Sequence, residues 1–144
     1  MFIVEFTHAI DDKGRVIIPA KLREGLGSTF YVTKGMERCL FVYPEEEYSN
    51  MANRLKSLNE ISRKEARGLN RLFLSGATDA NLDRQGRILL PPNLREYAFL
   101  DKDVVIIGVG DRVEIWDKER WDAYSDDENL NYDDLIDKLD GLDF

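Results

Sequence analysis

Short runs of β-prone residues separated by turns occur in two regions of the chain. The first run, residues 2–10, alternates partly between apolar and polar positions and predicts a strand. Two further pairs of runs each enclose a loop with glycine, which is typical of a β-hairpin. These pairs are residues 29–33 with 39–43 and residues 104–107 with 113–116. The pattern therefore predicts two strand-rich regions with the same internal order.

The two strand-rich regions contain copies of one thirteen-residue unit. Residues 11–23 read DDKGRVIIPAKLR, and residues 83–95 read DRQGRILLPPNLR. An internal repeat of this kind fixes the architecture before any single element is assigned. Each copy predicts a strand, a tight Asp-x-x-Gly-Arg turn, a second strand that ends at proline, and a short helix. Farther along, Tyr43 matches Trp116 and Tyr48 matches Trp121, so we expect the repeat to continue beyond this unit.

Helical spacing predicts two helices between the copies and a third after them. Pro44 followed by three glutamates is typical of a helix start, because acids favour the positive end of the helix dipole. Ser62 and Glu65 predict a capping box for the second helix. The apolar face of that helix indicates core or a subunit interface, and its basic face indicates a solvated surface or phosphate contacts. Residues 117–124 predict the third helix, followed by a tail that is either mobile or an amphipathic helix that docks elsewhere.

Composition narrows the class of protein. With 144 residues, of which 43% are hydrophobic, the chain is expected to form one compact domain or two very small ones. Its one cysteine, Cys39, lies in an apolar run and is expected to be a buried thiol. A single cysteine cannot form a disulfide within the chain, which favours a reducing, cytoplasmic setting. Neither a signal peptide nor a membrane span is expected. No nucleophile–base pair, metal-ligand cluster or phosphate loop is recognisable, so we expect no enzyme activity, cofactor, metal or small-molecule substrate.

The net charge of −8 resides in the tail rather than in the repeats. Residues 122–144 contain nine acids and one base, which sum to −8, whereas residues 1–121 contain 19 of each and sum to zero. The acidic total therefore does not exclude a nucleic-acid partner for the repeats, where basic clusters surround the two turns.

The arginines after the turn glycines, Arg15 and Arg87, are the main candidates for a binding site. An arginine fork suits bidentate contact with phosphate or with guanine O6 and N7. The aspartate four residues earlier either orients the fork or forms a structural salt bridge that stabilises the turn. Duplication favours a repeated binding surface. The candidate contact residues are Lys13, Arg15, Lys21, Arg23, Arg84, Arg87 and Arg95, and the candidate turn or orienting residues are Asp11, Gly14, Asp83 and Gly86.

The doubled unit, with a helical pair between its copies, resembles the MraZ family and the wider AbrB and SpoVT group of swapped-hairpin transcription factors. The resemblance covers roughly residues 1–124. It implies an α+β, mainly β fold: a tandem repeat of two AbrB/SpoVT-like swapped-hairpin half-barrels that form a pseudo-two-fold barrel, with helices between and after the repeats. The expected segments are repeat one at 5–47, a helical connector at 48–75, repeat two at 76–119 and an acidic tail at 120–144.

The resemblance also implies a function. It implies a DNA-binding transcriptional regulator, cytoplasmic and nucleoid-associated, that represses the promoter of its own division and cell-wall gene cluster through direct repeats. Double-stranded DNA would be the partner, and the chains would form a ring-like homo-oligomer. The family's Asp-x-x-x-Arg motif maps onto Asp11 and Arg15 and onto Asp83 and Arg87. The second copy has Arg84 and Gln85 where the first has Asp12 and Lys13, so equal roles for the two turns do not follow.

Two alternatives remain open from the sequence. In the first, the chain is not a DNA-binding regulator but a protein-interaction or antitoxin-like module whose basic turns bind acidic protein partners. The acidic tail, for its part, either folds back on the basic turns and competes with DNA or only keeps the protein solvated.

Overall fold

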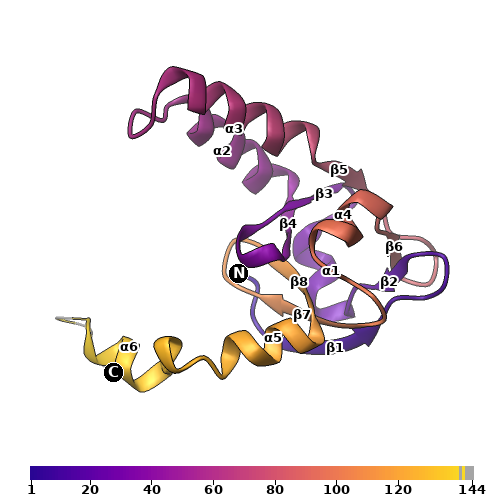
Figure 1. Ribbon diagram of the computed structural model, residues 1–144. Helices are drawn as coiled ribbons and strands as arrows, with labels where there is room; N and C mark the ends of the chain where they lie inside the picture. The colour runs from indigo at the N-terminus through magenta and orange to yellow at the C-terminus, as the bar shows by residue number, and fades with distance from the viewer. Residues whose placement is uncertain (140, 142–144) are drawn as a thin grey trace.

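The computed structural model describes residues 1–139 and 141. Its strands are β1 (Glu5–Ala9), β2 (Arg15–Ile17), β3 (Phe30–Lys34), β4 (Leu40–Pro44), β5 (Thr78–Ala80), β6 (Arg87–Leu89), β7 (Asp103–Gly108) and β8 (Val113–Asp117). Its α-helices are α1 (Ala20–Leu26), α2 (Glu45–Lys56), α3 (Arg63–Ser75), α4 (Pro92–Tyr97), α5 (Lys118–Ser125) and α6 (Tyr132–Asp137), and short 3-10 helices are η1 (Met36–Arg38) and η2 (Glu128–Leu130). Two helical arms project from the β body: the α2–α3 arm, and the chain that continues from α5 to α6 (Figure 1).

Strands from the two sequence copies are interleaved in one sheet. In the described part of the chain its order is β1-β7-β8-β4-β3-β5. Strand β1 of the first copy pairs with β7 of the second, and β5 of the second pairs with β3 of the first. The predicted hairpins β3–β4 and β7–β8 are confirmed, and their strands β4 and β8 join at the centre of the sheet. This exchange within one chain confirms the predicted α+β fold of two swapped half-barrels.

The strands after the two turns, β2 and β6, form a separate antiparallel ribbon. Its register pairs are Arg15–Leu89, Val16–Ile88 and Ile17–Arg87. Two more backbone bonds flank it, because the N–H groups of Ile18 and Leu90 donate to the carbonyl oxygens of Gly86 and Gly14, both at 2.9 Å. Exchanging the two copies maps this ribbon onto itself, so the pseudo-two-fold axis passes between Val16 and Ile88.

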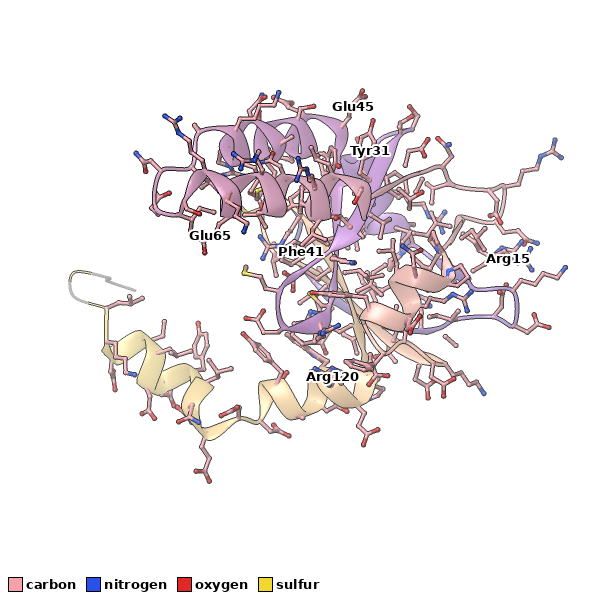
Figure 2. The ribbon with its side chains drawn as sticks, turned by 45° about the horizontal axis from the view of Figure 1, so that its top comes forward. Arg15, Tyr31, Phe41, Glu45, Glu65 and Arg120 are labelled. Carbon is pink, nitrogen blue, oxygen red and sulfur yellow. The ribbon has the colours of Figure 1, made fainter. Side chains whose placement is uncertain are left out.

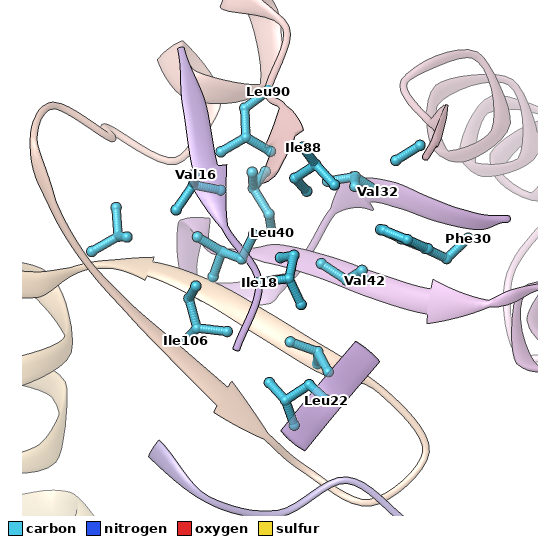
Figure 3. Close-up of a cluster of buried hydrophobic side chains, with 14 of the residues drawn as sticks. Val16, Ile18, Leu22, Phe30, Val32, Leu40, Val42, Ile88, Leu90 and Ile106 are labelled. Carbon is cyan, nitrogen blue, oxygen red and sulfur yellow. The ribbon is translucent and has the colours of Figure 1, made fainter. Parts of the chain in front are cut away.

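The core is shared by both copies. Matched pairs of aliphatic residues from the ribbon and the short helices enter one cluster, in which each side chain is at most 1% exposed (Figure 3). These pairs are Val16 and Ile88, Ile18 and Leu90, and Leu22 and Leu94. Burial of each such side chain contributes about 1.5–3 kcal/mol to the stability of the fold. Since neither copy encloses this cluster alone, the two half-barrels are expected to fold as one unit.

A second cluster, mostly aromatic, attaches the helices to the outer face of the sheet. Tyr48 of α2 lies 6.4 Å from Tyr43 between ring centroids, and Trp121 of α5 lies 5.2 Å from Trp116. These are the aromatic positions that the repeat matches, so the predicted correspondence is confirmed in space. Cys39 is fully buried beside them, as expected, and burial raises the pKa of its thiol well above the ordinary value.

The prolines act as the sequence predicts. Pro19 and Pro91 follow the ribbon strands and cap α1 and α4, with φ of −53° and −60°. Their fixed φ suits a helix start, and their lack of an N–H ends strand pairing. The Ser62–Glu65 capping box of α3 is also confirmed.

The prediction of one strand over residues 2–10 is wrong at its beginning. Strand β1 starts at Glu5 because Val4 has a φ of +88°, which interrupts the alternation of faces. Phe2 is buried and bonds Gly110 through the backbone, whereas Val4 is 37% exposed. Here the chain runs against Gly108, whose missing side chain leaves room for the backbone of Ile3.

The arms carry apolar residues that the described body does not cover. Phe73 of α3 packs against the aromatic cluster, whereas Leu69 and Leu72 are 40% and 65% exposed. Only part of the apolar face of this helix is therefore monomer core, and the interface alternative remains for the rest. The tail contains the helix α6, as one of the two alternatives predicted, but Tyr132 and Leu139 are exposed, so this helix does not dock on the rest of the described chain. Residues 140 and 142–144 lie outside the described residues.

Candidate nucleic-acid interface

Each aspartate of the repeated motif organises its turn through three hydrogen bonds. Oδ1 of Asp11 accepts from the backbone N–H of Lys13 at 3.0 Å and of Arg15 at 2.8 Å. Its Oδ2 accepts from Nε of Arg15 at 2.8 Å. Asp83 does the same with Gln85 and Arg87, at 2.9, 2.9 and 2.8 Å. The turn glycines have positive φ, +83° at Gly14 and +76° at Gly86.

These bonds keep both aspartates ionised. The backbone N–H of Arg15 is the largest cause that lowers the pKa of Asp11, and its side chain adds to the effect. The backbone and side chain of Arg87 lower the pKa of Asp83 in the same way. Each turn therefore holds an anion beside an arginine at neutral pH.

The structure combines the two alternatives that the sequence left open for the arginines. Nε of each fork is bound to its aspartate, as in a structural salt bridge. Yet the side chains of Arg15 and Arg87 remain 31% and 24% exposed. Among the described residues the terminal nitrogens make one longer contact, from Nη1 of Arg87 to Oδ2 of Asp11 at 3.7 Å. The aspartates thus orient the forks and leave their outer edges available to a ligand.

Arg23 and Arg95 are held more tightly than the sequence suggests. Nε of Arg23 donates to the carbonyl oxygen of Ile18 at 2.7 Å, and Nε of Arg95 donates to that of Leu90 at 2.9 Å. Each guanidinium covers the turn glycine of the other repeat, Arg23 over Gly86 and Arg95 over Gly14. These half-buried arginines therefore position the turns in addition to any contact of their own.

The outer face of the ribbon carries two apolar residues that the sequence reasoning missed. Ile17 and Leu89 are 40% and 60% exposed. Each lies two residues after the arginine of its strand, Arg15 or Arg87, and so on the same face as that arginine. Period-two alternation was the available signal: if Val16 and Ile18 point to the core, Ile17 points outward. The face thus combines two arginine forks with two aliphatic side chains.

The remaining candidates are exposed around this face. Lys13 and Arg84 lie in the two turns, and Lys21 lies in the first turn of α1. Figure 2 shows Arg15 at the end of the molecule opposite Glu65 of the α2–α3 arm. The helix α6 also lies on the side away from β2 and β6, so the described tail does not cover the ribbon (Figure 1).

Within residues 1–139 and 141, no group of three or more His, Cys, Asp or Glu side chains is arranged to hold a metal ion. No helix of this part of the chain is both long and apolar enough to cross a membrane.

The fold defines a class: a swapped-hairpin barrel in which one chain supplies both halves, with a paired Asp–Arg turn from each half on one ribbon. The family profile described as "MraZ protein, putative antitoxin-like" matches residues 1–72 and 73–139. The chain belongs to the MraZ family.

Curated relatives of this chain carry the name Transcriptional regulator MraZ. The protein of Finegoldia magna is 53% identical over 143 residues, 99% of each chain. That of Symbiobacterium thermophilum is 58% identical over 135 residues, 94% of this chain and 97% of its own. That of Moorella thermoacetica is 54% identical over 139 residues, 96% of each. These names describe the relatives as transcription regulators.

Proposed function

We propose that this protein is a sequence-specific DNA-binding transcriptional regulator whose β2–β6 ribbon and two Asp–Arg turns contact double-stranded DNA. The observation that carries the proposal is the duplicated fork: Arg15 and Arg87 are fixed at Nε and exposed at their outer edges on one ribbon. A fork that is oriented before binding loses little conformational entropy when it meets its ligand.

The two-stranded form and the side chains of the ribbon suit a major groove. The groove admits a two-stranded β-ribbon, and an arginine is the commonest bidentate partner of guanine O6 and N7. In the proposed complex Arg15 and Arg87 read guanines, while Ile17 and Leu89 contact thymine methyl groups. Because the ribbon is pseudo-symmetric, the two forks would read related bases on either side of the axis.

The surrounding cations would fix the register on the duplex. Lys13, Lys21 and Arg84 are exposed and form no ion pair among the described residues, so they are free to neutralise phosphates. Arg23 and Arg95 would contribute chiefly by holding the turns. Contacts of this kind position a protein without carrying sequence information.

The biological setting rests on family resemblance. We propose that the protein represses the promoter of its own division and cell-wall gene cluster through direct repeats, in the cytoplasm and associated with the nucleoid. A ring-like homo-oligomer would present several ribbons at fixed spacing and gain avidity from individually weak contacts. The division of the chain into segments 5–47, 48–75, 76–119 and 120–144 remains a prediction.

An interaction module for acidic protein partners is the second candidate. The antitoxin-like description of the family profile favours it, and the same arginine forks suit carboxylates as well as phosphates. Recovery of a stoichiometric protein partner, together with no measurable DNA binding, would decide for this alternative.

Fluorescence polarisation with a labelled duplex from the chain's own upstream region tests the proposal. Arg15→Ala is expected to weaken binding to that duplex by about tenfold or more, because a good bidentate pair contributes about 1–3 kcal/mol. Arg120→Ala is the matched control: it removes the same charge from a side chain that lies over Phe99 of the body and is separated from Arg15 in Figure 2. Unchanged affinity of the Arg15→Ala variant would refute the proposed interface.

A further inference from the structure

The tip of the α2–α3 arm forms a concavity with an apolar floor and a basic rim. Its volume is about 900 Å³. The apolar part of its lining, here called the floor, is formed by Leu55, Leu58, Ile61 and Ala66, and Asn59, Ser62 and Asn70 add polar groups to the lining. The rim is cationic and is formed by Lys56, Arg63, Arg67 and Arg71. A surface of this composition fits a partner that is both apolar and acidic.

The charges of the arm have no internal partner in the described structure. Residues 54–71 contain six bases and two acids and sum to +4. None of these bases forms an ion pair with residues 1–139 or 141. The arm therefore presents an uncompensated positive field around its apolar floor.

The tail of the same chain has the complementary composition. Residues 126–139 contain six acids and one base, which sum to −5, and none of these charges is paired within the described residues. The helix α6 exposes its apolar side chains: Tyr132 is 72% exposed, Leu135 40% and Leu139 54%. An amphipathic helix laid into an apolar groove is a common recognition mode.

DNA is the less suitable occupant of this concavity. Phosphates would gain from the basic rim but would leave the apolar floor without a partner. The tip of the arm also projects from the side of the body away from β2 and β6, so a duplex on the ribbon would not reach it (Figure 1).

We infer that the concavity of the α2–α3 arm binds the acidic helix α6 of a second copy of this chain. Within one copy, α6 lies apart from α2 and α3 in both views (Figures 1 and 2). Docking between copies joins two different surfaces, so it is heterologous and either closes into a ring or continues as a filament. The inference rests on the proposed self-association and identifies the two segments that would form it.

A charge swap in the full-length chain tests the contact, with mass measured by light scattering after size exclusion in the absence of DNA. Arg67→Glu with Arg71→Glu reverses the rim, and Asp133→Lys with Asp134→Lys reverses the tail. Each double variant is expected to weaken self-association by about tenfold or more, since it places like charges together. An equimolar mixture of the two variants is expected to regain the wild-type mass, because each then offers the complement of the other.

The matched control is Arg54→Glu with Lys64→Glu, which changes the same charge on the same arm outside the concavity and is expected to keep the wild-type mass. A wild-type chain that stays monomeric would overturn the self-association itself. An assembled wild type whose mass is insensitive to both reversals would overturn only this interface. The effect of Arg15→Ala on DNA binding bears on neither conclusion, so failure of the proposed DNA-binding function and failure of this interface are distinguishable.

Cysteine cross-linking separates docking between copies from docking within one copy. The chain's own Cys39 is buried, so cysteines introduced as Ala66→Cys and Leu135→Cys would be the reactive pair. Oxidation of the double variant is expected to give covalent dimers and higher multimers on a denaturing gel. A product that migrates only as a cross-linked monomer would overturn the inference in favour of an intramolecular contact.

Discussion

Arg23 of the first repeat lies against Gly86 of the second, where a Cβ atom at position 86 would overlap its guanidinium group. Nε of Arg23 donates to the carbonyl oxygen of Ile18, and the N–H of Ile18 donates to the carbonyl oxygen of Gly86. Arg95 lies in the same way against Gly14, 3.0 Å from the position of a Cβ atom. Each turn that presents a candidate DNA-contacting arginine is therefore supported by an arginine of the other repeat.

Gly86→Ala is expected to destabilise the protein by about 2–3 kcal/mol. The φ of +76° costs an L-residue about 1–2 kcal/mol, and moving Arg23 off Ile18 costs about 1 kcal/mol for the lost hydrogen bond. Urea unfolding followed by circular dichroism measures the change. Gly68→Ala is the control, because its Cβ atom would meet nothing within 4 Å on α3, and it is expected to stabilise by roughly 0.5–1 kcal/mol. Equal stability of Gly86→Ala and the wild type would contradict this account of the turn.

This support of one turn by the other repeat could not be predicted from the sequence. Local chemistry was sufficient to predict the turns, the strands that end at proline and the Ser62 cap, because each of these features depends on residues within a few positions of one another. The contact of Arg23 with Gly86 depends on how the copies pair, and nothing near Arg23 marks it. The positive φ of Val4 likewise occurs at a contact distant in sequence, where the N–H of Gly108 donates to the carbonyl oxygen of Val4.

The geometry of the candidate DNA-binding site was likewise predictable only where it depends on residues of one turn. The orientation of Arg15 by Asp11 follows from their spacing within one turn, so the sequence pointed to it directly. The approach of Arg87 to Asp11 joins different turns and needed the structure. The exposure of Leu89 does not follow from the prediction of a strand before the proline, because that prediction does not assign the aliphatic residues to the two faces of the strand.

Acid is expected to destabilise the two turns. The pKa values of Asp11 and Asp83 are lowered in the folded state, so their contribution to stability is fully present above the unfolded value of about 3.9. That contribution is lost as the pH falls through the lower folded values. Thermal unfolding between pH 7 and pH 2 is therefore expected to show a decline below about pH 4, because protons then bind the unfolded chain more readily.

The double variant Asp11→Asn with Asp83→Asn identifies the source of that decline. Asparagine keeps an oxygen for the backbone N–H groups of the turn but does not titrate. The melting temperature of the double variant is expected to be lower than that of the wild type at pH 7 and to fall less steeply in acid. A decline as steep as that of the wild type would assign the acid sensitivity to other carboxylates, such as Glu65 in its capping box.

Two neighbouring residues of β6 are expected to separate stability from binding. Ile88 is 1% exposed and faces the core, so Ile88→Ala is expected to cost about 2–5 kcal/mol of unfolding free energy. Leu89 is 60% exposed on the outer face, so Leu89→Ala is expected to leave stability within about 0.5 kcal/mol of the wild type. In the proposed complex Leu89→Ala weakens binding to the upstream duplex severalfold. Denaturant melts and polarisation on both variants make the comparison, and normal affinity of Leu89→Ala would remove this side chain from the interface.

The exposed cations of the turns are expected to set the salt dependence of DNA binding rather than its sequence preference. Lys13 and Arg84 form no ion pair among the described residues, so each is available to displace a counterion from a phosphate. The slope of log K against log salt is negative, and each lost phosphate contact reduces its magnitude by about 0.9. Titrations at several salt concentrations should therefore give Lys13→Ala and Arg84→Ala shallower slopes, with equal losses of affinity for the upstream duplex and a random one. Arg15→Ala should instead lose more on the upstream duplex, because it reads bases. A Lys13→Ala variant that loses discrimination at an unchanged slope would place Lys13 on base edges instead of phosphates.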